Sequence, residues 1–540
     1  MSAPSSIGLI TSGAFVDQEL VAEFGLLPPS FLPLGVGRLY DMQIDCLRKN
    51  FTETFPLYMT VPESFDVPAY DTQRLNEKGV TLLPVPDDMQ LGEAIVYAIN
   101  VINAYNTCVR ILHGDTVLSQ IPTQLDVIAG HAEGDDYSWA AIKHSDNVIV
   151  SLQTFEATSE QNTENPVACG YFAFSNGAEL VRAISQVRGR FIDGINNYLQ
   201  RRPMKMEEIK EWYDFGHIQT YFRSRRLVTT ARAFNSLQIT RNTVRKLSAD
   251  TFKMKAEAEW FESVPPKVQP YAARLLDKGE QGQRAFYSTE YQYAPNLSEL
   301  YVFSAIGRVS WKKILTSCAE FLEICAATPG DKPRDDYSRQ LMGSKTVERL
   351  ERFAKETGFD IEHELVYKGR KMPSLLEISR QLETMVSFDP AASSTMMHGD
   401  FCFSNILYNS RNSRISVIDP RGYVFSEKRE IYGDCRYDIA KYSHSVDGLY
   451  DFILAGRYDL KQDGLYNFDL NFDTSSHRQW LQSAFSEMSI AGISVSSAEI
   501  RAITTSLFIS MLPLHSDRPD RQKAFIANAL RLYSTLEGKI

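Results

Sequence analysis

The chain has 540 residues, of which 44% are hydrophobic and 23% are charged, proportions typical of folded globular proteins rather than of long disordered chains. Its 57 basic and 67 acidic side chains give a net charge of −10, which disfavours a general nucleic-acid binder. Seven scattered cysteines without a Cys-x-x-Cys pair predict a reducing compartment, and no apolar run is long enough to span a bilayer. We expect a cytoplasmic protein with no nucleic-acid partner and no membrane insertion.

Short apolar runs alternate with helical stretches over about the first 235 residues. The sequence predicts strands at 6–12, 56–61, 80–85 and 109–113, and helices at 39–49 and 91–104. This order is typical of an α/β layer domain whose parallel strands are joined by right-handed crossovers. Because ligands in such sheets bind beyond the carboxyl ends of the strands, Asp115 lies where a functional group is expected.

The pattern changes near residue 236, which we take as the boundary between domains at 1–235 and 236–540. In the second domain we predict strands at 243–248, 287–290, 406–408 and 415–419, a helix at 252–261 and a mainly helical region at 310–386. The turn-forming residues between the last two strands predict a hairpin. About the last hundred residues are expected to be helical, with the capping-box sequence Ser496–Glu499 opening a helix through Met511.

The strongest chemical signal is His398-Gly399-Asp400, followed by Asn405 and, after the hairpin, by Asp419. Phosphoryl transfer from a nucleotide needs one carboxylate to orient the attacking hydroxyl, a second to hold Mg²⁺, and a neutral oxygen ligand for the metal. One compact loop supplies all three groups at this spacing, and the glycine lets the backbone turn sharply. Each residue alone is explained equally well as a turn or cap residue, but the three together favour a kinase.

This stretch resembles the aminoglycoside phosphotransferase and choline kinase-like family, whose motif is His-Gly-Asp, then Asn, then a strand that ends in Asp. The resemblance implies a bilobal, protein-kinase-like small-molecule kinase that uses ATP. It also implies Asp400 as catalytic base, Asn405 and Asp419 as Mg²⁺ ligands, and His398 as a brace for the loop.

A kinase of this type also needs a lysine on an N-lobe strand for the α- and β-phosphates, oriented by a glutamate on a helix. Lys246 and Glu257 fit that order. Arg245 and Glu259 remain alternatives, because a shift of register exchanges them. A solvated charged helix would also explain the interleaved Lys and Glu residues. No glycine-rich loop precedes Lys246, which departs from protein kinases but is tolerated in the family that the chain resembles.

A polar segment at 433–445 is predicted to be a helix that packs on the catalytic loop, as in that family. Asp438 is expected to support the loop, and Asp434 or His444 to touch the substrate. The acceptor pocket of the family lies among the C-terminal helices. The sequence does not separate a sugar or polyol from an amino alcohol as the acceptor.

Four stretches of the first half resemble, in order, the sugar-1-phosphate nucleotidyltransferases. They are Leu32–Gln43, Leu112–Thr116, Cys169–Ser175 and Trp212–Tyr221. The resemblance implies a Rossmann-like fold of the GT-A type. It further implies that Asp115, as a catalytic residue, and Asp214 hold Mg²⁺ between the α-phosphate of CTP or another nucleoside triphosphate and the attacking phosphate. Gly13 and Arg38 are the candidates for contact with the nucleotide.

This half also departs from the family. The stretches that correspond to its Gly-x-Gly-x-Arg loop and to the residues around its conserved lysine, 11–15 and 28–33, contain neither arginine nor lysine. Without those cations a bound triphosphate loses much of its charge compensation. Arg38 is the available substitute, although it comes later than the family's arginine. The fold is therefore a firmer expectation than the activity.

Together the two resemblances imply a fusion like those encoded among bacterial capsule and surface-polysaccharide genes. The leading hypothesis is a bifunctional enzyme that phosphorylates a small hydroxyl substrate and transfers a nucleotide to the product. The alternatives are a kinase with an inactive nucleotidyltransferase-like binding domain, and a non-enzymatic assembly protein with a pseudo-kinase domain. A homo-oligomer is left open.

Overall fold

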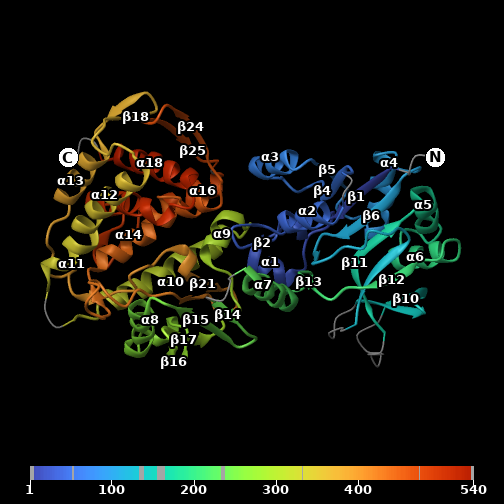
Figure 1. Ribbon diagram of the computed structural model, residues 1–540, viewed down its shortest axis with the longest axis horizontal. Helices are drawn as coiled ribbons and strands as arrows, with labels where there is room; N and C mark the ends of the chain where they lie inside the picture. The colour runs from blue at the N-terminus through green and yellow to red at the C-terminus, as the bar shows by residue number, and fades with distance from the viewer. Residues whose placement is uncertain are drawn as a thin grey trace. The chain divides into compact units, whose positions relative to one another are not determined.

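A computed structural model describes residues 5–51, 54–132, 139–154, 165–232, 237–330, 333–473 and 475–536 (Figure 1). The chain divides into two compact units. The N-terminal unit comprises Met1–Arg225 and Phe303–Ala305, and the C-terminal unit comprises Arg226–Val302 and Ile306–Ile540. The boundary predicted at residue 236 lies outside the described residues.

The N-terminal unit is built on a nine-stranded sheet with the order β5-β4-β1-β6-β11-β8-β12-β10-β9. Its strands are β1 (Ser6–Thr11), β4 (Leu57–Pro62), β5 (Val80–Val85), β6 (Cys108–His113), β8 (Val127–His131), β9 (Ala140–Ser145), β10 (Val148–Thr154), β11 (Val167–Phe174) and β12 (Lys205–Glu208). Its helices are α1 (Gln18–Phe24), α2 (Leu39–Asn50), α3 (Ala69–Glu77), α4 (Leu91–Val101), α5 (Gly177–Ser185), α6 (Phe191–Leu199) and α7 (Ile218–Arg232).

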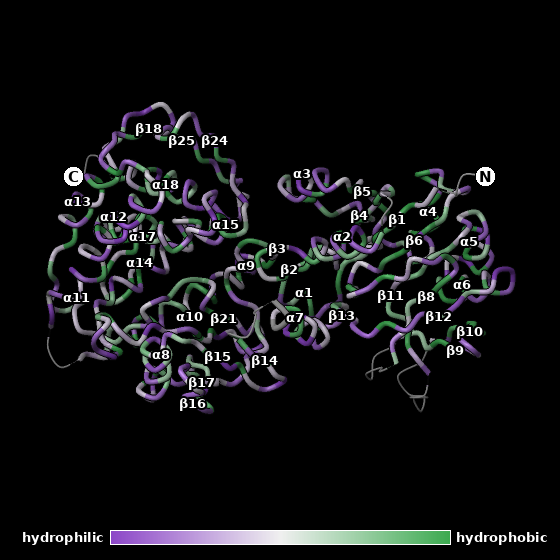
Figure 2. The backbone as a smooth tube through the Cα atoms, viewed as in Figure 1, coloured by the Kyte–Doolittle hydropathy of each residue, from purple (hydrophilic) through white to green (hydrophobic). Residues whose placement is uncertain are grey.

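Helices cover both faces of this sheet. Side chains alternate along β1, so that Leu9 packs in one core with α4, α5 and α6, whereas Ile10 packs in the other with α2 and α3. A strand buried on both faces needs an almost continuous apolar sequence, and Figure 2 shows hydrophobic colour along β6. The outcome is a layered α/β unit.

The strands predicted from the apolar runs, β1, β4, β5 and β6, pair in parallel, as expected. The rest of the sheet departs from this pattern, because β11 runs antiparallel to both β6 and β8. A parallel connection needs a crossover, usually a helix, and no helix lies between β6 and β11 in the described part of the chain. The sheet is therefore mixed.

The C-terminal unit begins with a four-stranded antiparallel sheet in the order β14-β15-β17-β16, with helix α8 (Thr251–Ser263) packed on it. Its strands are β14 (Leu237–Ile239), β15 (Thr243–Ser248), β16 (Leu275–Gln281) and β17 (Arg284–Glu290). Helix α8 begins where the Asp250 side chain accepts a hydrogen bond from the Lys253 backbone N–H (3.0 Å), an N-cap that fixes the first turn.

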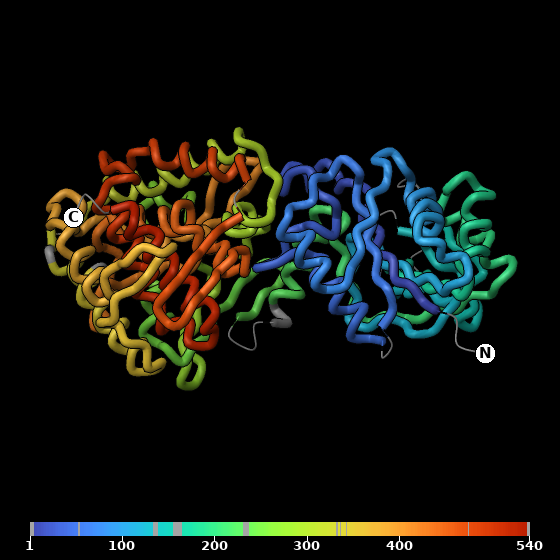
Figure 3. The backbone as a smooth tube through the Cα atoms, turned by 90° about the horizontal axis from the view of Figure 1, so that it is seen from above, coloured from blue at the N-terminus to red at the C-terminus, as the bar shows by residue number. Residues whose placement is uncertain are grey.

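A larger, mainly helical part follows, which Figure 3 shows in yellow to red. Its helices are α9 (Leu297–Phe303), α10 (Arg308–Ala326), α11 (Asp335–Arg339), a π-helical turn (Gln340–Ser344), α12 (Lys345–Thr357), α13 (Leu375–Thr384), α14 (Cys435–Val446), α15 (Tyr450–Leu454), α16 (Ser476–Ser486), α17 (Ala498–Ser510) and α18 (Pro519–Tyr533). The predicted hairpin is present as β21 (Ile406–Asn409) paired antiparallel with β22 (Arg414–Val417).

Two expectations for this part need correction. The regions predicted to be helical contain a small sheet, β19-β18-β25-β24, formed by β18 (Leu365–Tyr367), β19 (Arg370–Met372), β24 (Asp459–Asp463) and β25 (Asn467–Asn471). The β18–β19 turn has positive φ at both Lys368 and Gly369, the conformation of a tight hairpin turn. The capping residue of α17 is Ser497 rather than Ser496, and Glu499 binds Arg436 instead of closing a capping box.

Gly422 holds the loop after the hairpin against α8. It has a φ of +66°, and a Cβ there would lie 2.1 Å from the Ala256 carbonyl oxygen, whereas Gly464 has the same φ with no heavy atom within 4 Å. We predict that Gly464→Ala lowers stability by about 1 kcal/mol, the cost of a left-handed backbone. Gly422→Ala should cost about 1–3 kcal/mol more, because the loop or the helix must also shift.

The midpoint of thermal unfolding of the two variants, compared with that of the unchanged protein, measures this difference. Equal losses at the two positions would contradict the close packing of the loop on α8.

Candidate functional site

A half-buried ion-pair cluster joins the four-stranded sheet of β14–β17 and helix α8 to the loop after β22. The Lys246 ammonium on β15 lies 3.0 Å from Glu257 Oε2 on α8 and 2.9 Å from Asp419 Oδ1 beyond β22. The Tyr287 hydroxyl on β17 donates a second hydrogen bond to Glu257 Oε2 (2.7 Å). Burial lowers the pKa of Lys246, but the two carboxylates outweigh it and raise that pKa above its ordinary value, so the lysine is charged.

The two alternatives to this pair point elsewhere. Arg245, the neighbour on β15, lies on the Phe286 ring, with its guanidinium carbon 3.6 Å from the ring centroid. Glu259 binds Arg429 Nε (2.8 Å), and its side chain is 38% exposed against 2% for Glu257. The strand and helix registers thus bring Lys246 and Glu257 together and leave Arg245 and Glu259 outside the cluster.

The loop between β20 (Thr395–Met396) and β21 holds Asp400 between an amide and an ammonium. Asn405 Nδ2 donates to Asp400 Oδ2 (2.9 Å), and Lys441 Nζ on α14 lies 2.8 Å from Asp400 Oδ1. Burial raises the pKa of Asp400, but the charge and hydrogen bond of Lys441 outweigh it and lower that pKa to about 2. Asp400 is therefore an ionised carboxylate with a fixed orientation and a side chain that is 42% exposed.

The backbone of this loop is braced by buried polar groups. Asp438 on α14 accepts hydrogen bonds from the N–H groups of His398 (2.6 Å) and Gly399 (2.8 Å). His398 Nδ1 accepts from the Asp400 N–H (3.3 Å), so its Nε2 carries the proton and donates to the Ile418 carbonyl (3.0 Å). Burial lowers the pKa of His398 to about 4, which makes it a neutral bridge between the loop and the end of the hairpin.

Gly399 allows the turn beside Asp400. Its φ is +81°, and a Cβ there would lie 2.6 Å from the Cβ of Arg421. Asp419 also has a left-handed backbone, with a φ of +56°, which turns the chain after the hairpin strand. Both predicted turns of the motif therefore occur at left-handed residues.

Asn405 and Asp419 have the donor atoms that Mg²⁺ prefers. Asn405 bonds to Asp400 through its side-chain nitrogen Nδ2. Its side-chain oxygen Oδ1 has a 3.5 Å contact from Ser404 Oγ. Asp419 bonds to Lys246 through Oδ1, and its side chain is 43% exposed. The backbone N–H of Ile418, the residue two before Pro420 and next to Asp419, also donates to the backbone carbonyl of Asn405 (3.0 Å). The backbone therefore links the two candidate ligands. These residues fit a metal that also binds nucleotide oxygens.

The sequence analysis did not identify Lys441, and it expected Asp434 or His444 to touch the substrate. Lys441 lies three residues after Asp438 on α14, so the helical period was the available signal. Asp434 and His444, named for substrate contact, are fully buried. Asp434 pairs with Arg436 (2.6 Å), and His444 packs between the rings of Tyr450 and Phe508.

The N-terminal unit brings Asp115 and Asp214 together at the carboxyl end of β6. The short strands β7 (Thr116–Leu118) and β13 (Trp212–Asp214) pair antiparallel, with Asp214 opposite Thr116. A Cβ at Gly216 would lie 2.8 Å from Asp115 Oδ2 and 3.4 Å from Asp214 Oδ1. Burial and the charge of Asp214 raise the pKa of Asp115 to about 6. Asp214 Oδ2 is buried without a hydrogen-bond partner, which fits a cation between the two carboxylates.

The two nucleotide candidates of this unit have different surroundings. Gly13 follows β1, and a Cβ there would lie 2.6 Å from the side chain of Val85. Arg38 is 4% exposed, and its guanidinium binds Asp71 (2.9 Å) and donates to the carbonyls of Phe31 (2.6 Å) and Phe303 (2.7 Å). Arg38 is thus held by protein acceptors, and we leave it out of the nucleotide site proposed below.

No group of three or more His, Cys, Asp and Glu side chains that could hold a metal occurs within the described ranges. Within the same ranges, no helix is long and apolar enough to cross a bilayer.

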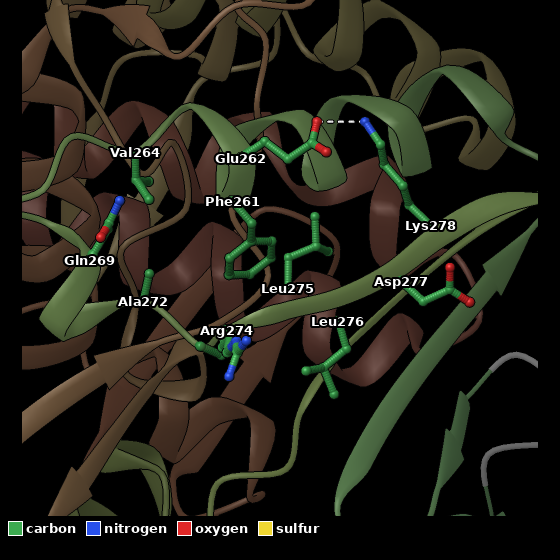
Figure 4. Close-up of a pocket in the computed structure, with 11 residues that line it drawn as sticks. Phe261, Glu262, Val264, Gln269, Ala272, Arg274, Leu275, Leu276, Asp277 and Lys278 are labelled. Atoms are coloured by element: carbon green, nitrogen blue, oxygen red, sulfur yellow. Dashed lines mark hydrogen bonds and ion pairs between the residues drawn. The ribbon is translucent and has the colours of Figure 1, made fainter.

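The cavity beside the four-stranded sheet of β14–β17 does not coincide with these residues. A cavity of about 680 Å³ is lined by the end of α8 and the start of β16, including Phe261, Arg274 and Leu275 (Figure 4). Lys278 and Glu262 form an ion pair at its edge (2.5 Å). None of the predicted site residues lines this cavity, so the ion pairs and hydrogen bonds, not the cavity, define the candidate site.

No protein-family model matches the sequence, and neither does any curated protein. Solved structures similar to the chain include UTP-bound UGPase from Acinetobacter baumannii (12% identity, 43% of this chain, 95% of that chain, TM-score 0.32). HddC from Yersinia pseudotuberculosis is another (14% identity, 42% of this chain, 99% of that chain, TM-score 0.31). A thermostable mutant of aminoglycoside phosphotransferase APH(4)-Ia is a third (13% identity, 58% of this chain, 99% of that chain, TM-score 0.32). Because the identities and TM-scores are low, we attach no function to these likenesses.

Proposed function

We propose that the C-terminal unit is an ATP-dependent kinase for a small hydroxyl substrate. The observation that carries this proposal is the placement of one half-buried lysine between Glu257 and Asp419, in the same unit as the Asp400–Asn405 contact. A charged lysine held in this way is suited to bind the α- and β-phosphates of ATP. The ionised Asp400, fixed by an amide and an ammonium, is suited to orient a hydroxyl group.

In the proposed reaction the acceptor hydroxyl oxygen attacks the γ-phosphorus of ATP, and the bond from that phosphorus to the β-γ bridging oxygen breaks to release ADP. Asp400 accepts the hydroxyl proton, and Lys441 balances negative charge beside it. Mg²⁺ bound by Asn405 and Asp419 would neutralise phosphate charge. Lys246 would transfer part of its pairing from Asp419 to the phosphates when ATP binds.

We further propose that the N-terminal unit transfers a nucleotide from CTP or another nucleoside triphosphate to the phosphorylated product. An oxygen of the acceptor phosphate would attack the α-phosphorus, and pyrophosphate would leave. Asp115 and Asp214 would hold Mg²⁺ at that phosphorus. Asp214 Oδ2, which is buried without a hydrogen bond and lies 3.8 Å from His217 Nδ1, supports this role. A cytoplasmic enzyme that carries both units would supply an activated precursor for a surface polysaccharide.

A second candidate is a kinase whose N-terminal unit binds ligands without catalysis. Arg38 supports it, because its guanidinium is held by Asp71 and two carbonyl groups. The largest charge effects on Asp115 come from Asp214 and His217 rather than from a lysine or arginine. A triphosphate at this site would receive little compensation from protein cations.

Asp400→Asn tests the kinase. Removing the base should lower kcat for ADP formation by about 10²–10⁴-fold with little change in the affinity for ATP. Asp463→Asn, an exposed aspartate of β24, is the matched control and should keep full activity. Steady-state ADP release with a panel of sugars, polyols and amino alcohols measures the effect. Unchanged phosphorylation in Asp400→Asn would show that another group takes the proton.

Asp115→Asn tests the nucleotidyltransferase. Loss of one of the two carboxylates should abolish pyrophosphate release from the nucleoside triphosphate, because the metal loses a ligand. ADP formation by the same protein serves as the internal control and should persist. Absence of pyrophosphate release from the unchanged protein, with every nucleoside triphosphate and each phosphorylated product, would favour the kinase with a non-catalytic N-terminal unit.

A further inference from the structure

Four basic side chains gather around Asp400. Lys441 on α14 binds its carboxylate, and Arg421 lies against Gly399, the residue before it. Lys345 and Arg349 lie on α12, four residues apart and therefore on one face of that helix. The charges of Arg421, Arg349, Lys441 and Asp400 all act on Lys345, so these basic side chains belong to one electrostatic cluster.

Of these four basic side chains, Lys441 alone is paired with a carboxylate within the described residues. Arg349 donates to the carbonyl (3.3 Å) and the hydroxyl (3.0 Å) of Ser510, both neutral acceptors. Arg421 lies over the Tyr423 ring, with its guanidinium carbon 4.8 Å from the centroid. Lys345 is half-buried and has no ion pair or hydrogen bond to any residue in the part of the chain that the structure describes. Asp400 acts favourably on Lys345, and it already binds Lys441.

This arrangement is unfavourable for the protein alone. Burial lowers the pKa of Lys345 to about 6, and the charges of Arg421, Arg349 and Lys441 act in the same direction. Clusters of unpaired cations in a partly buried site are stabilised when an anion binds, because the anion supplies the missing charge and accepts the hydrogen bonds. The position beside Asp400 is also where an acceptor hydroxyl must lie in the proposed reaction.

We infer that the acceptor of the kinase carries an anionic group, a phosphate or a carboxylate, which Lys345, Arg349 and Arg421 hold while Asp400 orients the acceptor hydroxyl. This inference rests on the proposed kinase function. It narrows the acceptor to phosphorylated or acidic sugars and polyols and disfavours a cationic amino alcohol. Such an acceptor requires a preceding reaction that adds a phosphate or forms a carboxylate on a polyhydroxy compound.

The first experiment compares acceptors in matched pairs with the full-length protein. Glycerol is paired with glycerate and with glycerol 3-phosphate, glucitol with gluconate, and glucose with glucose 6-phosphate and glucuronate, while choline represents the cationic class. We expect kcat/KM for ADP formation to be at least about tenfold higher for an anionic member than for its neutral partner. The comparison of the carboxylate acceptors with the phosphate acceptors shows which anion the site binds.

Lys345→Gln should raise KM for the preferred anionic acceptor by about 10- to 100-fold and leave KM for ATP within about twofold. Lys355→Gln, an exposed lysine further along α12, is the matched control for the change in net charge and should leave both values unaltered. A rise in KM for ATP alone would show that the cluster holds the nucleotide and would overturn the inference. Better turnover of the neutral or cationic acceptors would also overturn it, yet would leave the kinase itself intact.

A binding measurement makes the test independent of the choice of acceptor. With saturating Mg²⁺ and AMP-PNP, whose phosphates occupy the nucleotide site, inorganic phosphate should raise the thermal midpoint of the unchanged protein and of Lys355→Gln relative to sodium chloride at equal ionic strength. The rise should be lost in Lys345→Gln. No rise in the unchanged protein, or an equal rise in Lys345→Gln, would contradict the proposed anion site. Absence of AMP-PNP binding would instead contradict the kinase.

Discussion

The ammonium group of Lys246 connects three parts of the C-terminal unit. It joins strand β15, helix α8 through Glu257, and the loop after β22 through Asp419, with contacts of 3.0 and 2.9 Å. Burying a lysine is costly unless carboxylates pair with it, so each partner depends on the others. Because Glu257 is also bound by Tyr287, the antiparallel sheet contributes two of its strands to the cluster. The spacing between the sheet and the catalytic loop is therefore fixed by charge as well as by packing.

The loop that carries Asp400 has its own supporting network, built from different residues. Asp438 holds the backbone of His398 and Gly399, and His398 links that turn to Ile418, one residue before Asp419. The loop and the lysine cluster thus meet at Asp419. In the proposed reaction Asp419 is shared between Lys246 and a metal, which gives the bound nucleotide a way to replace a protein ion pair with phosphate contacts.

Local patterns in the sequence were enough for part of this architecture. The apolar runs predicted β1, β5, β6 and the β21–β22 hairpin, because alternation and turn residues act over a few positions. The β18–β19 hairpin was missed because its strands are short and β18 also pairs with β25, about a hundred residues further along. A Lys-Gly pair between short apolar runs was the signal available for it.

The same distinction applies to the candidate site. Asp400, Asn405 and Asp419 are close in sequence, and their spacing alone pointed to one loop. Lys345 and Lys441 come from helices that tertiary packing brings to Asp400, and only Lys441 had a local signal, its helical spacing from Asp438. Arg38 shows the reverse: its place in the sequence suggested nucleotide contact, but its guanidinium is held inside the N-terminal unit by Asp71.

The most direct test of the proposed catalytic centre is a crystal structure of the full-length protein with AMP-PNP and Mn²⁺, with the metal located by its anomalous scattering. The account predicts a metal bound by Asn405 Oδ1 and the Asp419 carboxylate, with Lys246 on the α- and β-phosphates and the γ-phosphate beside Asp400. A metal and triphosphate bound away from these side chains would contradict it.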